Sequence, residues 1–352
     1  MSLLALPNEL LLDIFCDQLS TPVPNCCGDD SHFTSACTPP NATTLAHICQ
    51  SLRSFSLPFM YASVTANPES VQTLHELLTT SAQIASCVRD LRFFVTDASS
   101  VQIVLKILVC CTNLHSLRLD ASHAQTGIAA TLLNQLSGQR HLSMTLRCFP
   151  WDEITCYIKS NPKGLQMLSI MGSTTHPLIL AFESPTAARE PLTDVHTFTW
   201  DTGKFCPRVS VSVGQHIARM MPNVQMLDLT ITQYGIPLLQ SYAELGSRLT
   251  DLTVHFRSKI SRLCSVVAQL APSLRRYVAH GGDICQVLFS ADWESVEYMD
   301  VVCHTGCKSA QPADLREAIL RLVCRRPKAR VRVAVVGGLE LSRTGGGDSG
   351  LV

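Results

Sequence analysis

The sequence predicts an α/β protein: a short all-helical N-terminal segment followed by an irregular repeat solenoid with a parallel sheet on its concave face. Three observations predict this. The chain begins with an amphipathic helical pattern, and from residue 88 onward a short strand pattern recurs at intervals of about 22 to 30 residues. Hydrophobic residues make up 46% of the 352-residue chain and charged residues only 16%, so it can bury a large core.

The balance of positive and negative charges indicates which class of partner the chain could bind. Lys plus Arg and Asp plus Glu both number 28, so the formal net charge is zero. Binding a nucleic acid requires a concentrated basic surplus, because the phosphates must be neutralised. We therefore expect no nucleic-acid partner, which leaves proteins as the default partner class.

The first residues do not read as a signal peptide, since Glu9 and Asp13 interrupt the apolar run and no basic region precedes it. The most apolar internal stretch, residues 101–109, is too short to span a membrane and contains Lys106. We therefore expect no membrane partner and a cytoplasmic or nuclear location. The 16 cysteines are then expected to be reduced thiols.

Residues 6–19 form the first expected helix. Pro7 suits the first helical turn, and Glu9 lies favourably near the positive end of the helix dipole. Apolar residues recur at steps of three and four and make one broad stripe: Leu6, Leu10, Leu11, Ile14 and Phe15. Burying such side chains stabilises by roughly 1.5–3 kcal/mol each, so we expect this stripe to pack against its own domain or against another protein.

Residues 20–44 have the Pro, Gly, Ser, Thr, Asn and Asp content of a loop. A second helical pattern follows over residues 45–55, with one apolar face that contains Leu45, Ile48, Cys49 and Leu52. The N-terminal block ends with residues 57–64, before Pro68.

The repeated pattern carries apolar residues at its first, fourth and sixth positions. It occurs at residues 88–93, 114–119, 165–170, 195–200, 224–229, 249–254, 274–279 and 296–301, with a degenerate copy at 141–146 and a last strand at 331–335. Helical patterns lie between some of these strands, at residues 101–110, 151–159, 260–270 and 315–323. Strand, turn and helix at this period are typical of a leucine-rich-repeat solenoid; an ordinary parallel α/β domain is the alternative.

The N-terminal block resembles a known family. Residues 6–15, Leu-Pro-Asn-Glu-Leu-Leu-Leu-Asp-Ile-Phe, are similar to the first helix of an F-box, and residues 45–61 resemble the rest of that motif. Together with the repeats, the chain resembles the fungal-type F-box/leucine-rich-repeat substrate receptors of SCF cullin–RING ubiquitin ligases. The expected domains are an F-box at 1–67 with a loop insertion at 20–44, the repeat array at 68–338, and a flexible tail at 339–352.

This resemblance implies a helix-in-groove contact with a Skp-family adaptor and, through that adaptor, with a cullin. The adaptor-binding residues implied are Leu6, Pro7, Leu10, Leu11, Ile14, Phe15, Leu45, Ile48, Cys49 and Leu52. The alternative is that helix 6–19 only caps the end of the solenoid. The array departs from the usual repeat because Thr96, Ser122, Ser173 and Thr232 stand where Asn or Cys usually follows each strand.

A client protein is expected on the sheet, at outward positions between the strand apolar residues. These positions are Arg92, Arg118, Ser169, Thr199, Asp228, Thr253 and Asp300. Their charges are mixed, so they identify no client class, and each could equally be an ordinary solvated sheet residue.

No catalytic site, metal or cofactor is expected. Cys26, Cys27, His32 and Cys37 lack the paired spacing of a zinc site, and Cys303 reads as the end of a strand rather than as a metal ligand with Cys307. Phosphate-loop and zinc-helix motifs are absent from the sequence. The basic residues from Arg321 to Arg332 fit a solvated helix end that meets the last strand, with a polyanion-binding or nuclear-import patch as the alternative.

The sequence thus predicts a substrate-recognition adaptor and not an enzyme. A repeat scaffold that binds proteins without recruiting a ligase remains open, as does a weaker hypothesis of an enzyme with a cysteine nucleophile. The latter needs a cysteine beside a histidine, and the sequence gives no such pair to choose.

Overall fold

The computed structural model describes much of the chain after residue 56. The described ranges are 57–124, 128–136, 143–160, 162–172, 191–201, 211–231, 236–244, 248–256, 263–281, 291–303, 312–326, 328–335 and 339–343. The predicted helices 6–19 and 45–55 and the insertion 20–44 lie outside these ranges. The chain divides into two compact units, residues 1–132 and 133–352, which we describe separately.

In the first unit a parallel sheet alternates with helices. Its elements are β1 (Ser63–Ala66), α4 (Val71–Thr80), α5 (Ala82–Cys87), β2 (Asp90–Phe94), α6 (Ala98–Cys110) and β3 (Ser116–Asp120), followed by α7 (Ile128–Leu136). β2 pairs in parallel with both β1 and β3. Burial alternates along β2, where Leu91 and Phe93 are 0% and 1% exposed, which is the pattern of a strand with one face in the core.

The second unit continues with the same arrangement over more strands. Its elements are β4 (Ser143–Arg147), α8 (Trp151–Lys159), β5 (Met167–Met171), β6 (Thr197–Asp201), α9 (Val211–Met220), β7 (Met226–Ile231), α10 (Ile236–Glu244), β8 (Asp251–Phe256), α11 (Leu263–Leu270), η3 (Ala271–Ser273), β9 (Arg276–His280), β10 (Tyr298–Cys303), α13 (Pro312–Arg325), β11 (Arg330–Val335) and β12 (Leu339–Arg343). Strands β4 to β11 pair in parallel in chain order.

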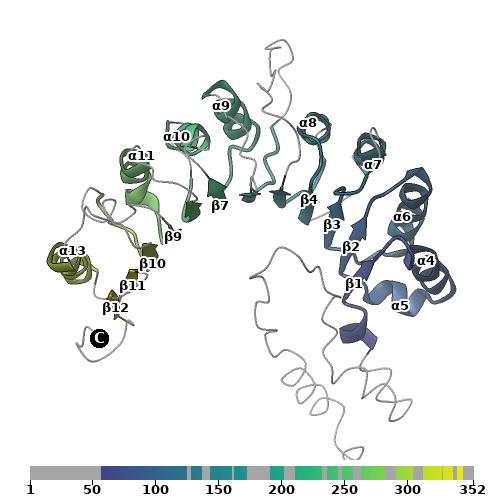
Figure 1. Ribbon diagram of the computed structural model, residues 1–352, viewed down its shortest axis with the longest axis horizontal. Helices are drawn as coiled ribbons and strands as arrows, with labels where there is room; N and C mark the ends of the chain where they lie inside the picture. The colour runs from purple at the N-terminus through teal and green to yellow at the C-terminus, as the bar shows by residue number, and fades with distance from the viewer. Residues whose placement is uncertain are drawn as a thin grey trace, which may run out of the picture. The chain divides into compact units, whose positions relative to one another are not determined.

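The layers of the second unit are clear in Figure 1. Its strands lie along the inner side of an arc, and helices α8, α9, α10, α11 and α13 lie on the outer side. The opposite face of the sheet carries no helix in the part of the chain that the structure describes. An α/β solenoid-like fold is therefore confirmed for the array.

The repeated pattern identifies the strands correctly. Each of the predicted strand segments overlaps one of the strands β2 to β11. The three apolar residues of a copy are buried together, as in Leu165, Leu168 and Ile170, which are 1%, 0% and 0% exposed. The first of the three lies two residues before the strand, so it fills the core beneath the turn. The four predicted helices correspond to α6, α8, α11 and α13.

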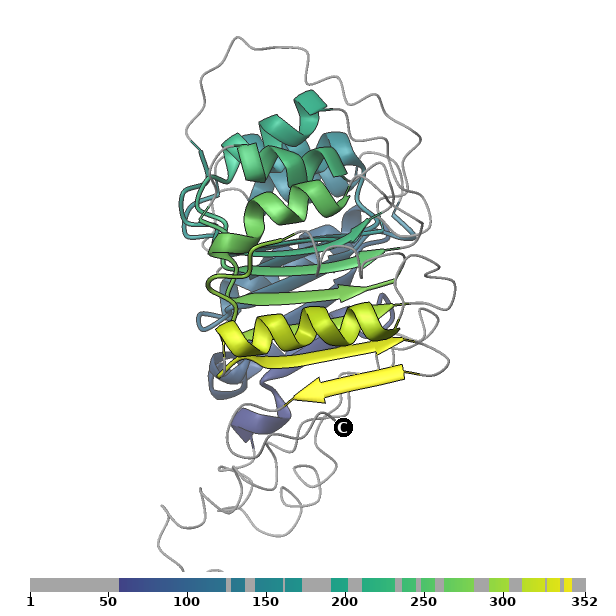
Figure 2. The same ribbon diagram turned by 90° about the vertical axis from the view of Figure 1, so that its left-hand side faces the viewer.

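The expected boundaries of the array are wrong at both ends. β1 pairs with β2, so the sheet begins at Ser63 and not after residue 67. β12 pairs antiparallel with β11, as their opposed arrows in Figure 2 show, so residues 339–343 are a strand and not a flexible tail. Both segments carry apolar residues at the repeat spacing, Tyr61, Val64 and Ala66 at β1 and Val336, Leu339 and Leu341 at β12, so the predicted array ends one strand short on each side.

The core of the second unit contains aromatic pairs and one very close helix contact. The rings of Phe198 and Trp200 are 6.4 Å apart, and those of Tyr277 and Trp293 are 5.0 Å apart. On α9, a Cβ added to Gly214 would lie 2.7 Å from the backbone oxygen of Pro237, at the start of α10. Helices α9 and α10 therefore approach as closely as they do because this position has no side chain.

A side-chain hydrogen bond links successive repeats at the third position before a strand. Asn113 Nδ2 donates a hydrogen bond to the backbone carbonyl oxygen of Ser86 (2.8 Å), and Asn223 Nδ2 donates one to the backbone carbonyl oxygen of Thr193 (2.8 Å). At the same position before β9, the Ser273 hydroxyl lies 3.0 Å from the Leu249 oxygen. These bonds satisfy backbone carbonyls, one at the end of α5 and two in turns, that the sheet ladder does not reach.

Replacing Asn223 with alanine is expected to lower the free energy of unfolding by about 1 kcal/mol, because the Thr193 carbonyl loses its donor. Urea denaturation followed by circular dichroism measures this. Gln166→Ala is the matched control, since Gln166 is exposed in an equivalent turn before β5. Equal midpoints for the two variants would show that the link contributes nothing.

Candidate functional site

The open face of the sheet in the second unit is the candidate site. Along each strand, the residues before, between and after the two buried apolar residues face away from the helices. The strand register aligns these residues into three rows that cross the strands. The middle row contains Thr145, Ser169, Thr199, Asp228, Thr253, Val278, Asp300 and Arg332.

The structure places the expected client-facing residues in two groups. In the first unit, Arg92 and Arg118 are register partners on β2 and β3. In the second unit the middle row brings together four adjacent members, Ser169, Thr199, Asp228 and Thr253, and Val278 separates this run from Asp300.

Ser169 differs from the other three members of this run because it is only 2% exposed, whereas they are half-buried. The expectation of an accessible side chain is therefore wrong at this position. The physical reason is size: Met167 and Met171 lie two residues to either side on the same face of β5, and both side chains are much longer than that of serine.

The expected adaptor-binding residues cannot be placed on this fold. They lie outside the described residues: Leu6, Pro7, Leu10, Leu11, Ile14, Phe15, Leu45, Ile48, Cys49 and Leu52.

An aromatic side chain lies between two arginines at the C-terminal end of the open face. Tyr298 on β10 is the register partner of Arg276 on β9 and of Arg330 on β11. The Arg276 Cζ atom lies 5.4 Å from the centroid of the Tyr298 ring, which is a cation–π distance. Tyr298 is 36% exposed, and both arginines are exposed. We call these three residues the Arg–Tyr–Arg row.

An acidic and histidine-containing cluster lies on β6 to β9 of the same face. Asp228 Oδ1 is 4.0 Å from His255 Nε2, and the rings of His255 and His280 are 5.0 Å apart. Burial raises the pKa of Asp228 and the Asp201 carboxylate raises it further, whereas His255 and Arg276 act in the opposite direction. A cation brought to this cluster would therefore favour the ionised form of Asp228.

Asp300 and Arg332 form an ion pair within the middle row. Arg332 Nη1 is 3.7 Å from Asp300 Oδ2, and the Asp300 side chain is 13% exposed. The other carboxylate oxygen, Oδ1, is buried and accepts no hydrogen bond from the described residues. Since Arg332 is half exposed, the pair holds one arginine at the surface beside the Arg–Tyr–Arg row.

Sequence reasoning selected only the middle row and missed its neighbours. Arg276, Tyr298 and Arg330 lie two residues before the middle row on their strands, while His255 and His280 lie two residues after it. The signal that could have found them is the period-two alternation of a strand, which also directs these positions outward.

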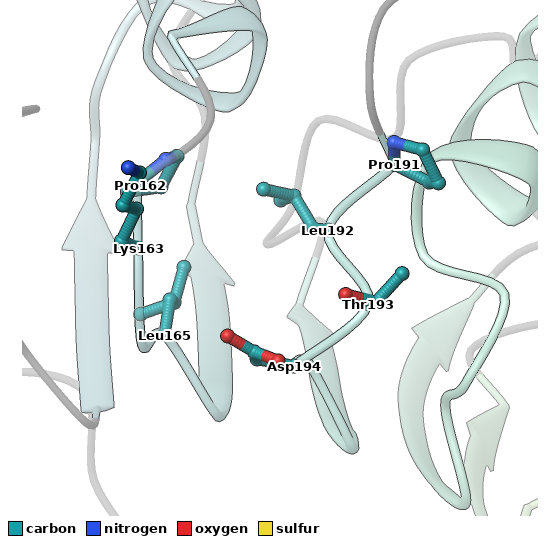
Figure 3. Close-up of a pocket in the computed structure, with 7 residues that line it drawn as sticks. All are labelled: Pro162, Lys163, Leu165, Pro191, Leu192, Thr193 and Asp194. Carbon is teal, nitrogen blue, oxygen red and sulfur yellow. The ribbon is translucent and has the colours of Figure 1, made fainter.

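A hollow of about 330 Å³ lies between the turns that precede β5 and β6 (Figure 3). Pro162, Lys163, Leu165, Pro191, Leu192, Thr193 and Asp194 line it. The bottom of the hollow is formed by the hydrophobic core, because Leu165 and Leu192 are buried. Among the described residues that line the hollow, only Lys163 and Asp194 are titratable.

The one buried thiol among the described cysteines does not suggest a reactive centre. Cys111 is buried, and burial raises the pKa of its thiol to about 11, with Cys110 acting in the same direction. Little nucleophilic thiolate is then present near neutral pH.

Cys303 ends β10, as expected from the sequence. No group of three His, Cys, Asp or Glu residues in the described ranges could hold a metal ion, and Cys26, Cys27, His32 and Cys37 lie outside those ranges.

The basic cluster near the C-terminus is a helix end that meets the last parallel strand, as predicted. α13 ends at Arg325, and β11 begins at Arg330. Arg321 pairs with Glu317 at 2.5 Å, and Arg325 pairs with Asp292 at 3.2 Å. Arg330 belongs instead to the open sheet face.

The fold and the site define a class: an α/β repeat protein with an open, polar parallel-sheet face. No family model matches the chain, and no curated protein matches it. Within the described residues, no helix combines the length and the apolar character needed to cross a membrane.

Proposed function

We propose that this chain is a substrate-recognition adaptor of an SCF-type ubiquitin ligase. The open sheet face of the second unit binds a client protein. The helices expected from the sequence at residues 6–19 and 45–55 bind a Skp-family adaptor that connects the chain to a cullin. The first half of the proposal rests on the geometry of the face, and the second rests on the resemblance of the N-terminal sequence to an F-box.

The observation that carries the proposal is the composition of the open face. One side of the sheet packs under helices, while the other presents side chains in aligned rows. Among them are Tyr298, Arg276 and the 43%-exposed Met226, and Tyr, Arg and Met are the residue types enriched at protein interfaces. A solvated face without a partner has no need of exposed aromatic and methionine side chains on its strands.

The proposed mechanism is proximity. A client held on the sheet face and a conjugating enzyme held by the cullin are parts of one assembly. The reaction of a client lysine then becomes effectively intramolecular, which raises its effective concentration without any chemical group from this chain. The proposal therefore assigns binding roles and no catalytic role to the residues of the sheet face.

Affinity capture tests the proposal. The tagged full-length chain is expressed in cells treated with a proteasome inhibitor, captured from native lysate, and analysed by quantitative mass spectrometry. We expect a Skp-family adaptor and a cullin among the captured proteins, together with a client that accumulates under inhibition. Capture of clients without adaptor or cullin would contradict the ligase role and support the alternative, a repeat scaffold that recruits no ligase.

A further inference from the structure

From β6 to β11, the charges on the open face of the second unit are segregated by strand, whereas Arg147 lies apart from them on β4. Asp201, Asp228 and Asp251 lie on β6, β7 and β8, whereas Arg276, Arg330 and Arg332 lie on β9 and β11. Asp300, on β10 in the basic half, is already paired with Arg332. Between β6 and β11 the face therefore has an acidic half and a basic half, arranged one after the other across the strands.

The two halves differ in how their charges are held. In the basic half, Arg276 stacks over Tyr298, and this contact holds a guanidinium group at the surface beside an exposed aromatic ring. In the acidic half, burial raises the pKa of Asp228 and the Asp201 carboxylate raises it further, and the nearest cationic partner of Asp228 is His255 at 4.0 Å, which is charged only when protonated. A basic side chain from outside would relieve this repulsion.

The strand register also gives the length of peptide that could reach from the acidic half to the basic half. Neighbouring strands are about 4.8 Å apart, so the three strand steps from Asp228 on β7 to Tyr298 on β10 span about 14 Å. An extended chain covers this distance with about four residues, at about 3.3 Å each. A helix would need about nine or ten residues and would need an apolar groove, which these mostly polar rows do not provide.

We propose that the open face binds an extended peptide segment with opposite charges at its two ends. Its acidic side chains contact the Arg–Tyr–Arg row, its basic side chains contact Asp201 and Asp228, and about four residues separate the two groups. The segment lies across the strands. This inference rests on the client-binding half of the proposed function and gives the chemical class of the client segment.

Synthetic peptides test the inference with the full-length chain. The probe is a fluorescein-labelled peptide with two glutamates, four neutral residues and two lysines, measured by fluorescence anisotropy at low salt. We expect it to bind at least about ten-fold more tightly than a peptide of the same composition with alternating charges, because like charges would face each other in the second complex. Affinity should peak at the four-residue spacer and fall for spacers of one and nine residues.

Charge reversal identifies the contact residues. Arg276→Glu with Arg330→Glu is expected to weaken the segregated peptide by about ten-fold or more and to make the chain prefer a peptide with lysines only. The control is Arg275→Glu with Arg326→Glu, which changes the net charge equally at two exposed arginines outside the three rows. We expect the control to bind the segregated peptide as the unaltered chain does. Circular dichroism checks that both variants are folded.

Three results would overturn the inference: no binding of the segregated peptide up to about 1 mM, equal affinity for the alternating peptide, or equal losses in the two charge-reversal variants. Each is distinguishable from failure of the ligase role, because adaptor and cullin capture depends on the N-terminal residues and is measured separately. Peptide binding by a chain that captures no cullin would support the sheet inference and contradict only the ligase role.

Discussion

Replacing Leu10 and Ile14 together with aspartate is expected to reduce capture of the Skp-family adaptor by more than about 100-fold. Each of these side chains contributes roughly 1.5–3 kcal/mol if it is buried in the groove of the adaptor. Losing both costs at least about 3 kcal/mol, and each 1.4 kcal/mol is a factor of ten in affinity. Quantitative mass spectrometry of the captured complex measures the ratio of adaptor to bait.

The matched control for this variant is Val109→Asp with Leu320→Asp. Both side chains are apolar and exposed, by 75% and 42%, so the same kind of substitution is made where no groove is expected. We expect adaptor capture by the control to equal that of the unaltered chain, and circular dichroism to be the same for all three proteins. Undiminished capture by the Leu10/Ile14 variant would rule out helix 6–19 as the anchor and would favour a capping role.

Replacing Trp200 with alanine is expected to destabilise the second unit by about 3–5 kcal/mol. Trp200 is 1% exposed, and its register partners on β5 and β7 are the fully buried Ile170 and Leu229. Its ring also lies 6.4 Å from that of Phe198, so the substitution leaves a large cavity between repeats. Because whole domains are stable by only about 5–15 kcal/mol, this is a substantial part of the total.

Urea denaturation followed by circular dichroism measures the effect of Trp200→Ala. Met226→Ala is the control, because Met226 lies on neighbouring β7 but is 43% exposed on the open face, where truncation should change stability by less than about 0.5 kcal/mol. If the two variants unfolded at the same urea concentration, the assignment of Trp200 to the core would be incorrect.

The strands were predictable because the spacing of apolar residues within a single repeat shows which of its residues are buried. In Leu165, Leu168 and Ile170, three apolar residues in six positions are enough to define a strand with one buried face and its preceding turn. Helices were harder to predict. Gly214 in α9 and Pro237 in α10 read as helix breakers in the sequence, yet the glycine is what allows these two helices to touch.

The candidate site was only partly predictable for a different physical reason. Period-two alternation shows which residues of one strand face outward, but the neighbours of a residue on a sheet depend on the register between strands. The sequence therefore selects Asp228 as an outward residue. It does not reveal that Tyr298 lies between Arg276 and Arg330, because these residues are more than 20 positions apart in the chain.

The central claim is that two separate surfaces of this chain connect a client to a ligase, and a four-way capture experiment tests it most directly. The baits are the unaltered chain, Leu10→Asp/Ile14→Asp, Arg276→Glu/Arg330→Glu, and the combination of all four substitutions. We predict that the helix variant loses adaptor and cullin but keeps the client, that the sheet variant loses the client but keeps adaptor and cullin, and that the combined variant loses both. Loss of the same set of proteins from both single-surface variants would contradict the account.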